Sequence, residues 1–226
     1  MRIAFFGGSF DPPHCGHLVI ADAAMTRLRL DRVLFAPVGR QPLKGDGAAT
    51  SFEDRCRMVE LAIAGHPAFQ LSLADAPQPG GQPNYTIHTL QRLQAQLAAS
   101  DELFCLLGAD SFLTMRQWYR AAQLLRLCPL IVAARPGWSL ADLSIAMPPG
   151  VGPLTRVNSS RVCEEFQAPA EPAGRVTLYV LPDMDADVSA TTIRAAFAGG
   201  SPAQGVLPPG VVDYIATHQL YSASRA

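Results

Sequence analysis

Short runs of hydrophobic residues alternate along the chain with longer segments in which apolar side chains recur every three or four positions. The short runs are expected to be strands, because strands of a parallel sheet are covered on both faces and are therefore apolar throughout. They lie at residues 3–6, 33–37, 69–73, 103–107, 130–134 and 176–181. The alternation predicts an α/β protein with crossover helices.

The segments between these strands have the period of amphipathic helices. Two sets of residues each share one helix face: Leu18, Ala21, Met25 and Leu28, and further along Thr86, Leu90, Leu93 and Leu97. The sequence Thr50-Ser-Phe-Glu53 is a capping box and predicts a helix through Leu61. The expected fold is a Rossmann-like, doubly wound parallel sheet with helices on both faces and a small C-terminal helical part around residues 211–218.

Two regions interrupt this pattern. Residues 39–49 are rich in glycine and polar residues and are expected to form an exposed, mobile loop. Residues 137–174 are rich in proline, glycine and serine and are expected to be a variable insertion at the edge of the sheet. No composition shift marks a second domain, so the chain is expected to be a single domain over residues 1–226.

The composition limits the classes of protein. The chain has 226 residues, 49% of them hydrophobic and 16% charged, which excludes a disordered chain. The formal net charge of -1 gives no reason to expect a nucleic-acid partner, because nucleic-acid-binding domains usually have a strongly basic face. Any anion must therefore be held by a local site.

The cysteines and the apolar runs indicate the compartment. Five cysteines without paired spacing are typical of reduced thiols. No signal peptide is expected, because residues 1–6 lead directly into a glycine turn, and no run approaches the roughly 20 apolar residues of a membrane span. The expected protein is cytoplasmic and has no membrane partner, and the sequence allows a homo-oligomer without specifying one.

The first chemically informative segment is Gly7-Gly-Ser-Phe-Asp-Pro-Pro-His-Cys-Gly-His17. It follows a predicted strand and opens a helix, where glycines let the backbone approach phosphate oxygens and the helix supplies free N–H donors. His14 and His17 can both face an anion in this turn and donate more strongly if they are charged. Two alternatives remain open: the glycines form only a tight turn, or the histidines and Cys15 bind a metal.

The second informative segment is Val188-Ser-Ala-Thr-Thr-Ile-Arg194, at the start of an apolar helix. Ser189 or Thr191 can cap this helix and leave its first N–H groups free for an anion, while Arg194 can bind a polyphosphate in a bidentate manner. The alternative is an ordinary helix cap followed by a solvated arginine.

Together the two segments resemble the H-x-G-H and I-S-x-T-x-x-R signatures of the nucleotidylyltransferase superfamily, which is related to class I aminoacyl-tRNA synthetases. In that superfamily both segments bind ATP phosphates. The resemblance implies ATP-binding roles for Gly7, Gly8, Ser9, Phe10, His14, His17, Ser189, Thr191 and Arg194.

The middle of the chain resembles the nicotinate-mononucleotide adenylyltransferase family. Residues 83–90 are similar to that family's P-S-Y-T-x-x-T-L segment and residues 108–111 to its G-x-D segment. The resemblance implies that Tyr85 and Thr86 hold the nicotinate carboxylate and that Trp118 stacks on the pyridine ring. Gly108 and Asp110 are implied on the ATP side, with Asp110 at a ribose hydroxyl, and Arg135 at the mononucleotide phosphate. As alternatives, Trp118 fills the core or Asp110 caps a helix.

The family usually has P-P-H-K in the mobile loop, where this chain has Gln41-Pro-Leu-Lys44. Lys44 keeps the cationic place, but Leu43 replaces the histidine, which puts one phosphate contact in doubt. The implied catalytic set is therefore His14, His17, Lys44 and Arg194. Magnesium is expected to be carried by ATP and water, and the sequence has no dedicated protein cage for it.

The resemblance implies that ATP is a co-substrate and that AMP passes from it to nicotinate mononucleotide. The products would be deamido-NAD and pyrophosphate, as a step in NAD biosynthesis. The alternatives are another small substrate, such as pantetheine phosphate or nicotinamide mononucleotide, or a non-catalytic nucleotide-binding regulator. An oxidoreductase that uses a dinucleotide is disfavoured because the chain lacks the G-x-G-x-x-G fingerprint.

Overall fold

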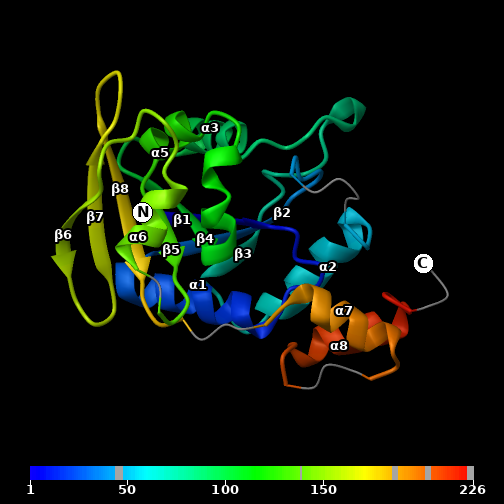
Figure 1. The fold of residues 1–226 in the computed structure, drawn as a ribbon. Coiled ribbons are helices and arrows are strands. Elements are labelled where there is room, and N and C mark those ends of the chain that lie inside the picture. The colour runs from blue at the N-terminus through cyan, green and yellow to red at the C-terminus, as the bar shows by residue number, and fades with distance from the viewer. Residues whose placement is uncertain (44–47, 138, 185–187, 202–204, 223–226) are drawn as a thin grey trace.

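One eight-stranded sheet forms the centre of the molecule (Figure 1). The computed structural model describes residues 1–43, 48–137, 139–184, 188–201 and 205–222. The strand order is β3-β2-β1-β4-β5-β8-β7-β6, in which β7 pairs antiparallel with both β8 and β6 and the remaining pairs are parallel. The strands are β1 (Arg2–Gly8), β2 (Arg32–Pro37), β3 (Phe69–Leu71), β4 (Glu102–Gly108), β5 (Leu130–Ala133), β6 (Thr155–Ser159), β7 (Glu164–Pro169) and β8 (Arg175–Leu181).

Successive side chains of the central strands enter two different hydrophobic cores. In β1, Phe5 belongs to one core and Phe6 to the other, and in β4 Cys105 and Leu106 divide in the same way. This is the two-residue period of a strand, and it explains why the runs are apolar throughout: each face of the sheet is buried. The six strands predicted from the sequence are all present, and the doubly wound α/β fold is confirmed.

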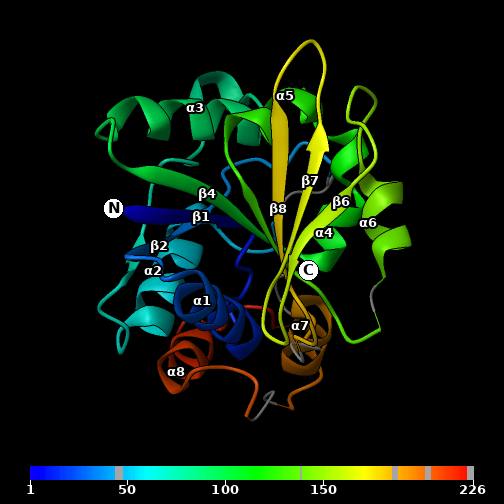
Figure 2. The ribbon, with the colours of Figure 1, turned by 90° about the vertical axis from the view of Figure 1, so that its left-hand side faces the viewer.

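Helices cover both faces of the sheet (Figure 2). The core on one face includes residues of α3, α4, α5 and α6, and the core on the other includes residues of α1, α2, α7 and α8. The helices are α1 (Cys15–Leu28), α2 (Phe52–Ile63), α3 (Thr86–Gln96), α4 (Ala109–Leu113), α5 (Ala121–Leu127), α6 (Leu140–Ala146), α7 (Ala190–Ala198) and α8 (Pro209–Thr217). None of the described helices is long and apolar enough to cross a membrane.

The start of α2 differs from the predicted capping box by one residue. Ser51, and not Thr50, is the cap, because the Ser51 hydroxyl accepts a hydrogen bond from the Asp54 amide at 3.0 Å. Thr50 instead donates its hydroxyl to the Asp11 carboxylate at 2.7 Å. Both residue types are good caps, so the sequence alone did not distinguish a capping role from a tertiary contact.

The region expected to be an insertion, residues 137–174, contains α6 and the β6–β7 hairpin. The two strands extend the sheet beyond β8 at one edge. Neither strand was predicted from the sequence. All five positions of β6 are exposed, so this strand has no apolar run. A bulge between Arg156 and Asn158 interrupts the pairing of β6 with β7, which is a common way to make an edge strand a poor template for further strands.

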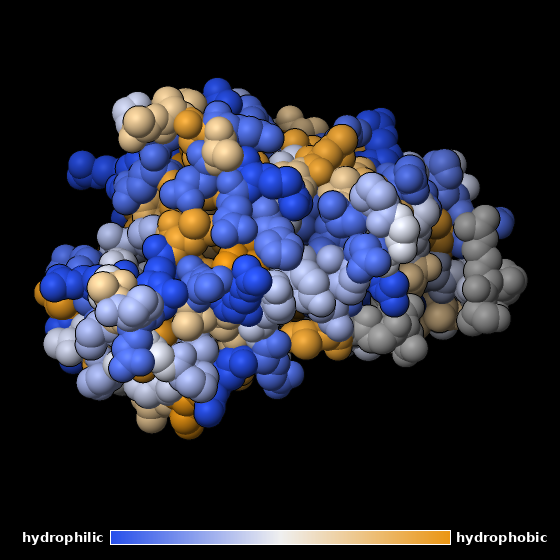
Figure 3. Space-filling model, turned by 90° about the horizontal axis from the view of Figure 1, so that it is seen from above, coloured by the Kyte–Doolittle hydropathy of each residue, from blue (hydrophilic) through white to orange (hydrophobic). Residues whose placement is uncertain are grey.

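The last helix, α8, packs against α2. The Tyr214 hydroxyl of α8 donates to the Asp54 carboxylate of α2 at 3.0 Å, and Val211 and Ile215 are buried. All five cysteines are free thiols. Seen from above, hydrophobic residues appear in small groups among hydrophilic ones and do not form one broad apolar surface (Figure 3).

Candidate active site

A cavity of about 740 Å³ opens where β1 and β4 end. From these adjacent strands the chain runs outward in opposite directions, to β2 and β3 on one side and to β5 and β8 on the other. Such a switch point is where open α/β sheets bind ligands. Fifteen of the expected site residues line the cavity: Gly7, Gly8, Ser9, Phe10, His14, His17, Tyr85, Thr86, Gly108, Asp110, Trp118, Arg135, Ser189, Thr191 and Arg194. Lys44 lies outside the described residues.

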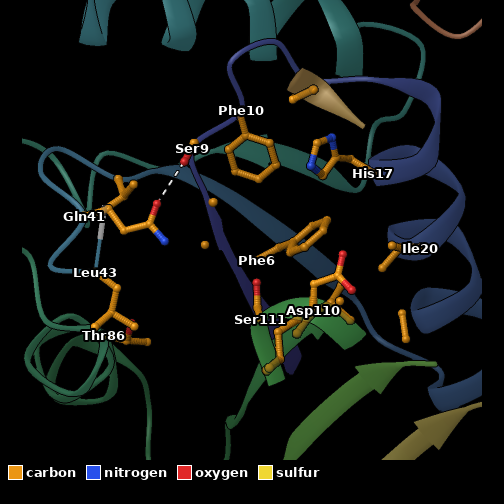
Figure 4. A pocket seen from close by; sticks show the side chains of 18 of the residues that line it. Phe6, Ser9, Phe10, His17, Ile20, Gln41, Leu43, Thr86, Asp110 and Ser111 are labelled. Atoms are coloured by element: carbon orange, nitrogen blue, oxygen red, sulfur yellow. Dashed lines mark hydrogen bonds between the residues drawn. The ribbon is translucent and has the colours of Figure 1, made fainter. Parts of the chain in front are cut away.

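The turn after β1 is shaped by tight aromatic packing. Phe10 is 2% exposed, has a left-handed backbone with φ of 49°, and lies edge-on against His17 with ring centroids 4.9 Å apart. A Cβ on Gly8 would lie 3.2 Å from the Phe10 ring, so glycine permits this close approach. Figure 4 shows Phe6, Phe10 and His17 beside one open space, with a hydrogen bond of 3.1 Å from the Ser9 hydroxyl to the Gln41 side chain.

His14 and His17 lie together at the start of α1. Their ring centroids are 3.7 Å apart, and the His14 amide donates to Nδ1 of His17 at 3.1 Å. Since Nδ1 of neutral His17 accepts this bond, its proton must be on Nε2, which can donate to a ligand. Nδ1 of His14 is buried and has no hydrogen-bond partner among the residues that the structure describes. A buried polar atom beside an open cavity is suited to a ligand that brings the missing partner.

Burial favours the neutral form of both imidazoles. Removal from water lowers the pKa of His14 to about 4. Burial also lowers the pKa of His17 well below its usual value, and the nearby His14 lowers it further. The charged form considered from the sequence is therefore disfavoured until an anion enters and stabilises it.

Arg194 of α7 reaches the first motif across the molecule. Its Nη1 donates to the Asp11 carbonyl at 2.8 Å and its Nη2 to the Thr191 hydroxyl at 3.3 Å. Ser189 is the residue before α7, and its side chain makes no capping hydrogen bond. The two sequence motifs are 183 positions apart at the Arg194–Asp11 contact, and the fold joins them in one cavity.

Tyr85, Trp118 and Tyr119 line a second part of the cavity, called here the aromatic part. Tyr85 and Tyr119 have ring centroids 4.5 Å apart and tilted by 36°. Trp118 is half-buried against the core and donates its indole N–H to the Thr114 hydroxyl at 2.9 Å. The tryptophan therefore both packs and lines the cavity, so the alternatives of core residue and ligand-facing residue are not exclusive.

Asp110 and Arg135 form an ion pair. Arg135 Nη2 lies 2.8 Å from an Asp110 oxygen, and the Asp110 side chain is 74% exposed. Two roles that the resemblance implied for separate parts of the substrate thus fall on one ion pair. Because exposed pairs contribute little, usually less than about 1 kcal/mol, a ligand can compete with it.

Two buried networks that support the cavity were not predicted. Asp75 accepts hydrogen bonds from Thr89 at 2.6 Å and Asn84 at 3.3 Å, and burial raises the pKa of its carboxyl group. Arg55 is 2% exposed and donates to the carbonyls of Ser9 and Val38. In the sequence, Arg55 is one charged residue of an amphipathic helix, so no signal distinguished it from a solvated one.

The fold and the site define a nucleotidyltransferase-like α/β protein, with a glycine turn, two histidines and a distant arginine at one switch point. The cytidylyltransferase-like family model matches residues 5–196. A probable nicotinate-nucleotide adenylyltransferase of Pelobacter propionicus is 37% identical over 98% of this chain and 99% of its own. The corresponding protein of Gloeobacter violaceus is 38% identical over 97% and 96%. The chain belongs to the nicotinate-nucleotide adenylyltransferases within the cytidylyltransferase-like family.

Solved structures agree on the fold. The nicotinic acid mononucleotide adenylyltransferase of Plasmodium falciparum, complexed with NaAD, superimposes with a TM-score of 0.71 at 16% identity and covers 97% of each chain.

Proposed function

We propose that this protein transfers AMP from ATP to nicotinate mononucleotide and releases pyrophosphate. The observation that carries this proposal is the convergence of His14, His17 and Arg194 on one cavity whose other part is lined by Tyr85 and Trp118. A phosphate-binding part and an aromatic part match the two substrates. The names of relatives that align over nearly the whole chain support the same reaction.

ATP binds, in this proposal, at the turn after β1 and the start of α7. Nε2 of His17 donates to a phosphate oxygen, and the free N–H groups at the start of α7 donate to other oxygens of the same triphosphate. Arg194 neutralises the departing pyrophosphate, and Lys44 adds a second cation from the loop that follows Gln41. Nucleotide and mononucleotide then meet near the carboxyl end of β4.

The mononucleotide binds at the aromatic part. Backbone donors at Tyr85 and Thr86 hold the nicotinate carboxylate, and Trp118 stacks on the pyridine ring, which is electron-poor and favours such contact. Asp110 exchanges its ion pair for a ribose hydroxyl of ATP, and Arg135 contacts the phosphate of the mononucleotide. Recognition of a carboxylate favours nicotinate over the uncharged nicotinamide.

The reaction is an in-line displacement at the α-phosphorus of ATP. A 5′-phosphate oxygen forms the new P–O bond while the bond to the bridging oxygen breaks, and both of its electrons leave with pyrophosphate. A phosphate monoester with a second pKa of about 6 is already anionic at neutral pH, so no general base is needed. Catalysis consists of positioning and of stabilising charge on the transferring group.

Among the described residues, no three histidine, cysteine, aspartate or glutamate side chains are grouped to hold a metal ion. Magnesium would therefore be bound mainly by the phosphate oxygens of ATP and by water, and would supply charge neutralisation.

The test is pyrophosphate release with ATP and each of three acceptors: nicotinate mononucleotide, nicotinamide mononucleotide and pantetheine phosphate. We expect the highest kcat/KM with nicotinate mononucleotide.

In the same assay His17→Ala should lower kcat by roughly two orders of magnitude, as loss of a transition-state donor does. Release with none of the acceptors would favour the non-catalytic alternative, and a His17→Ala rate near that of the unaltered protein would remove His17 from the chemistry.

A further inference from the structure

Tyr221 lies after the last helix, yet it reaches the turn that carries the first phosphate motif. Its hydroxyl donates to Oδ1 of Asp11 at 2.7 Å, and its ring contacts Phe197 of α7 with centroids 6.4 Å apart. The same hydroxyl lies 4.0 Å from the Met58 sulfur of α2. The Tyr221 side chain thus contacts the turn after β1, helix α2 and helix α7.

Asp11 is the centre of this junction and is only 3% exposed. Besides Tyr221, the Thr50 hydroxyl donates to its Oδ1 at 2.7 Å and the Ala49 amide to its Oδ2 at 2.6 Å. The backbone carbonyl of Asp11 accepts from Arg194 at 2.8 Å. The residue therefore joins the phosphate turn to the end of the loop, to the C-terminal segment and to the arginine of the second motif.

Two ionisable side chains, Arg55 and Tyr221, interact with the buried Asp11 carboxylate. Burial lowers the pKa of Arg55, and the nearby Asp11 carboxylate opposes this shift. Burial and the negative charge of Asp11 together raise the pKa of Tyr221 above its usual range, so its hydroxyl keeps its proton and acts as a donor. A carboxylate held by three donors has a fixed orientation, and that orientation fixes the turn around it.

We propose that Tyr221 is a positioning residue for ATP: its hydrogen bond to Asp11 fixes the phosphate turn and Arg194 in the arrangement that binds the triphosphate. This inference rests on the proposed function only in that ATP occupies the cavity. Loss of the bond loosens Asp11 and with it the Arg194 contact, while the residues of the aromatic part, which Tyr221 does not touch, keep their places. Loss of the Tyr221 hydroxyl is therefore expected to weaken binding of ATP and to leave binding of the mononucleotide unchanged.

The test compares Tyr221→Phe with Tyr214→Phe. Both variants lose a tyrosine hydroxyl that donates to a carboxylate from the C-terminal part of the chain, but Tyr214 binds Asp54, on the surface of α2. We expect Tyr221→Phe to weaken binding of a non-hydrolysable ATP analogue by roughly tenfold, the loss of one bond to a charged acceptor, and to raise KM for ATP similarly. KM for the mononucleotide should change less than about twofold. Tyr214→Phe should leave all of these constants unchanged.

A lowered melting temperature in both variants, with the ATP constants of the unaltered protein, would show that Tyr221 only stabilises the fold and would overturn the inference. If Tyr221→Phe does not fold, Thr50→Val removes the other side-chain donor to Oδ1 of Asp11 and should produce the same ATP-selective loss. Analogue binding is measured without the second substrate. The result therefore does not depend on which mononucleotide is used, and a failed acceptor assay would count against the proposed function alone.

Discussion

At the scale of single residues, burial changes the chemistry of the two histidines that line the cavity. Water stabilises the charged form of an exposed histidine, whereas here desolvation favours the neutral form of both imidazoles. Nε2 of His17 remains a donor because the His14 amide occupies Nδ1. The protein therefore offers directed N–H groups without holding two like charges 3.7 Å apart in the absence of ligand.

This arrangement predicts a pH dependence of stability. The pKa of a histidine in the unfolded chain is about 6.5, whereas that of His14 in the folded protein is about 4. Between these values the unfolded chain binds more protons, so the free energy of unfolding falls as the pH falls from about 6.5 to about 4. From pH ~7 to pH ~5 we expect His14 to account for a loss of about 2 kcal/mol.

Urea unfolding at the two pH values measures this loss. His14→Gln should remove the contribution of His14, whereas His218→Gln, at an exposed position after α8, should retain it. Equal pH dependence in both variants would contradict the assignment to His14.

At the scale of elements, the segment after β2 is fastened to the segment before α3. The Gly39 amide donates to the Asp75 carbonyl at 2.7 Å, and the Arg40 amide donates to Oδ1 of Asn84 at 2.9 Å. Asn84 is 4% exposed and directly precedes Tyr85. The segment that follows β2 and the part proposed to hold the mononucleotide therefore share one anchor.

Gly39 tests this anchor. A Cβ at Gly39 would lie 2.5 Å from the backbone of Pro77 and 2.8 Å from Oδ1 of Asn84, so the backbone must move. We expect Gly39→Ala to lower the free energy of unfolding by about 2 kcal/mol, a usual cost of overpacking, and to raise KM for the mononucleotide severalfold. Gly65→Ala, where nothing lies within 4 Å, should change stability by less than about 0.5 kcal/mol. Equal effects of the two substitutions would show that Gly39 is not an anchor.

At the scale of the whole molecule, the proposed binding of ATP depends on where individual side chains lie and not on the overall charge. The net charge is -1, with 18 basic and 19 acidic side chains. Among the described residues that line the cavity, the arginines are Arg135 and Arg194, and they come from different elements of the sheet's carboxyl edge. A ligand that contacts both ends of the chain should stabilise the entire domain.

ATP should therefore raise the melting temperature. A ligand at about 100 times its Kd stabilises the folded state by about 2.7 kcal/mol, which for a chain of this size corresponds to roughly 5–10 °C. Arg194→Ala should abolish most of this shift, because the variant loses a proposed triphosphate contact. Arg156→Ala, which removes an exposed ion pair with Glu164 on the β6–β7 hairpin, should retain the full shift. An undiminished shift in Arg194→Ala would remove Arg194 from the ATP site.

The sequence determined the elements and the chemistry that depend on local order. Continuous apolar runs identified the six strands of the parallel sheet, because a strand that is buried on both faces has apolar side chains at nearly every position. The glycine turn with His14 and His17, and the segment ending at Arg194, were recognisable because a strand–turn–helix connection places its polar residues at the carboxyl edge.

Only the tertiary structure decided which residues hold these parts in place. Thr50 and Tyr221 meet at Asp11 from positions 39 and 210 residues away, and neither has a local pattern that marks the contact. The exposed strand β6 also had no signal, since its pairing with β7 is made by the backbone and not by buried side chains. Periodicity reports which face of an element is buried, whereas the partner of a buried polar group depends on how distant elements pack.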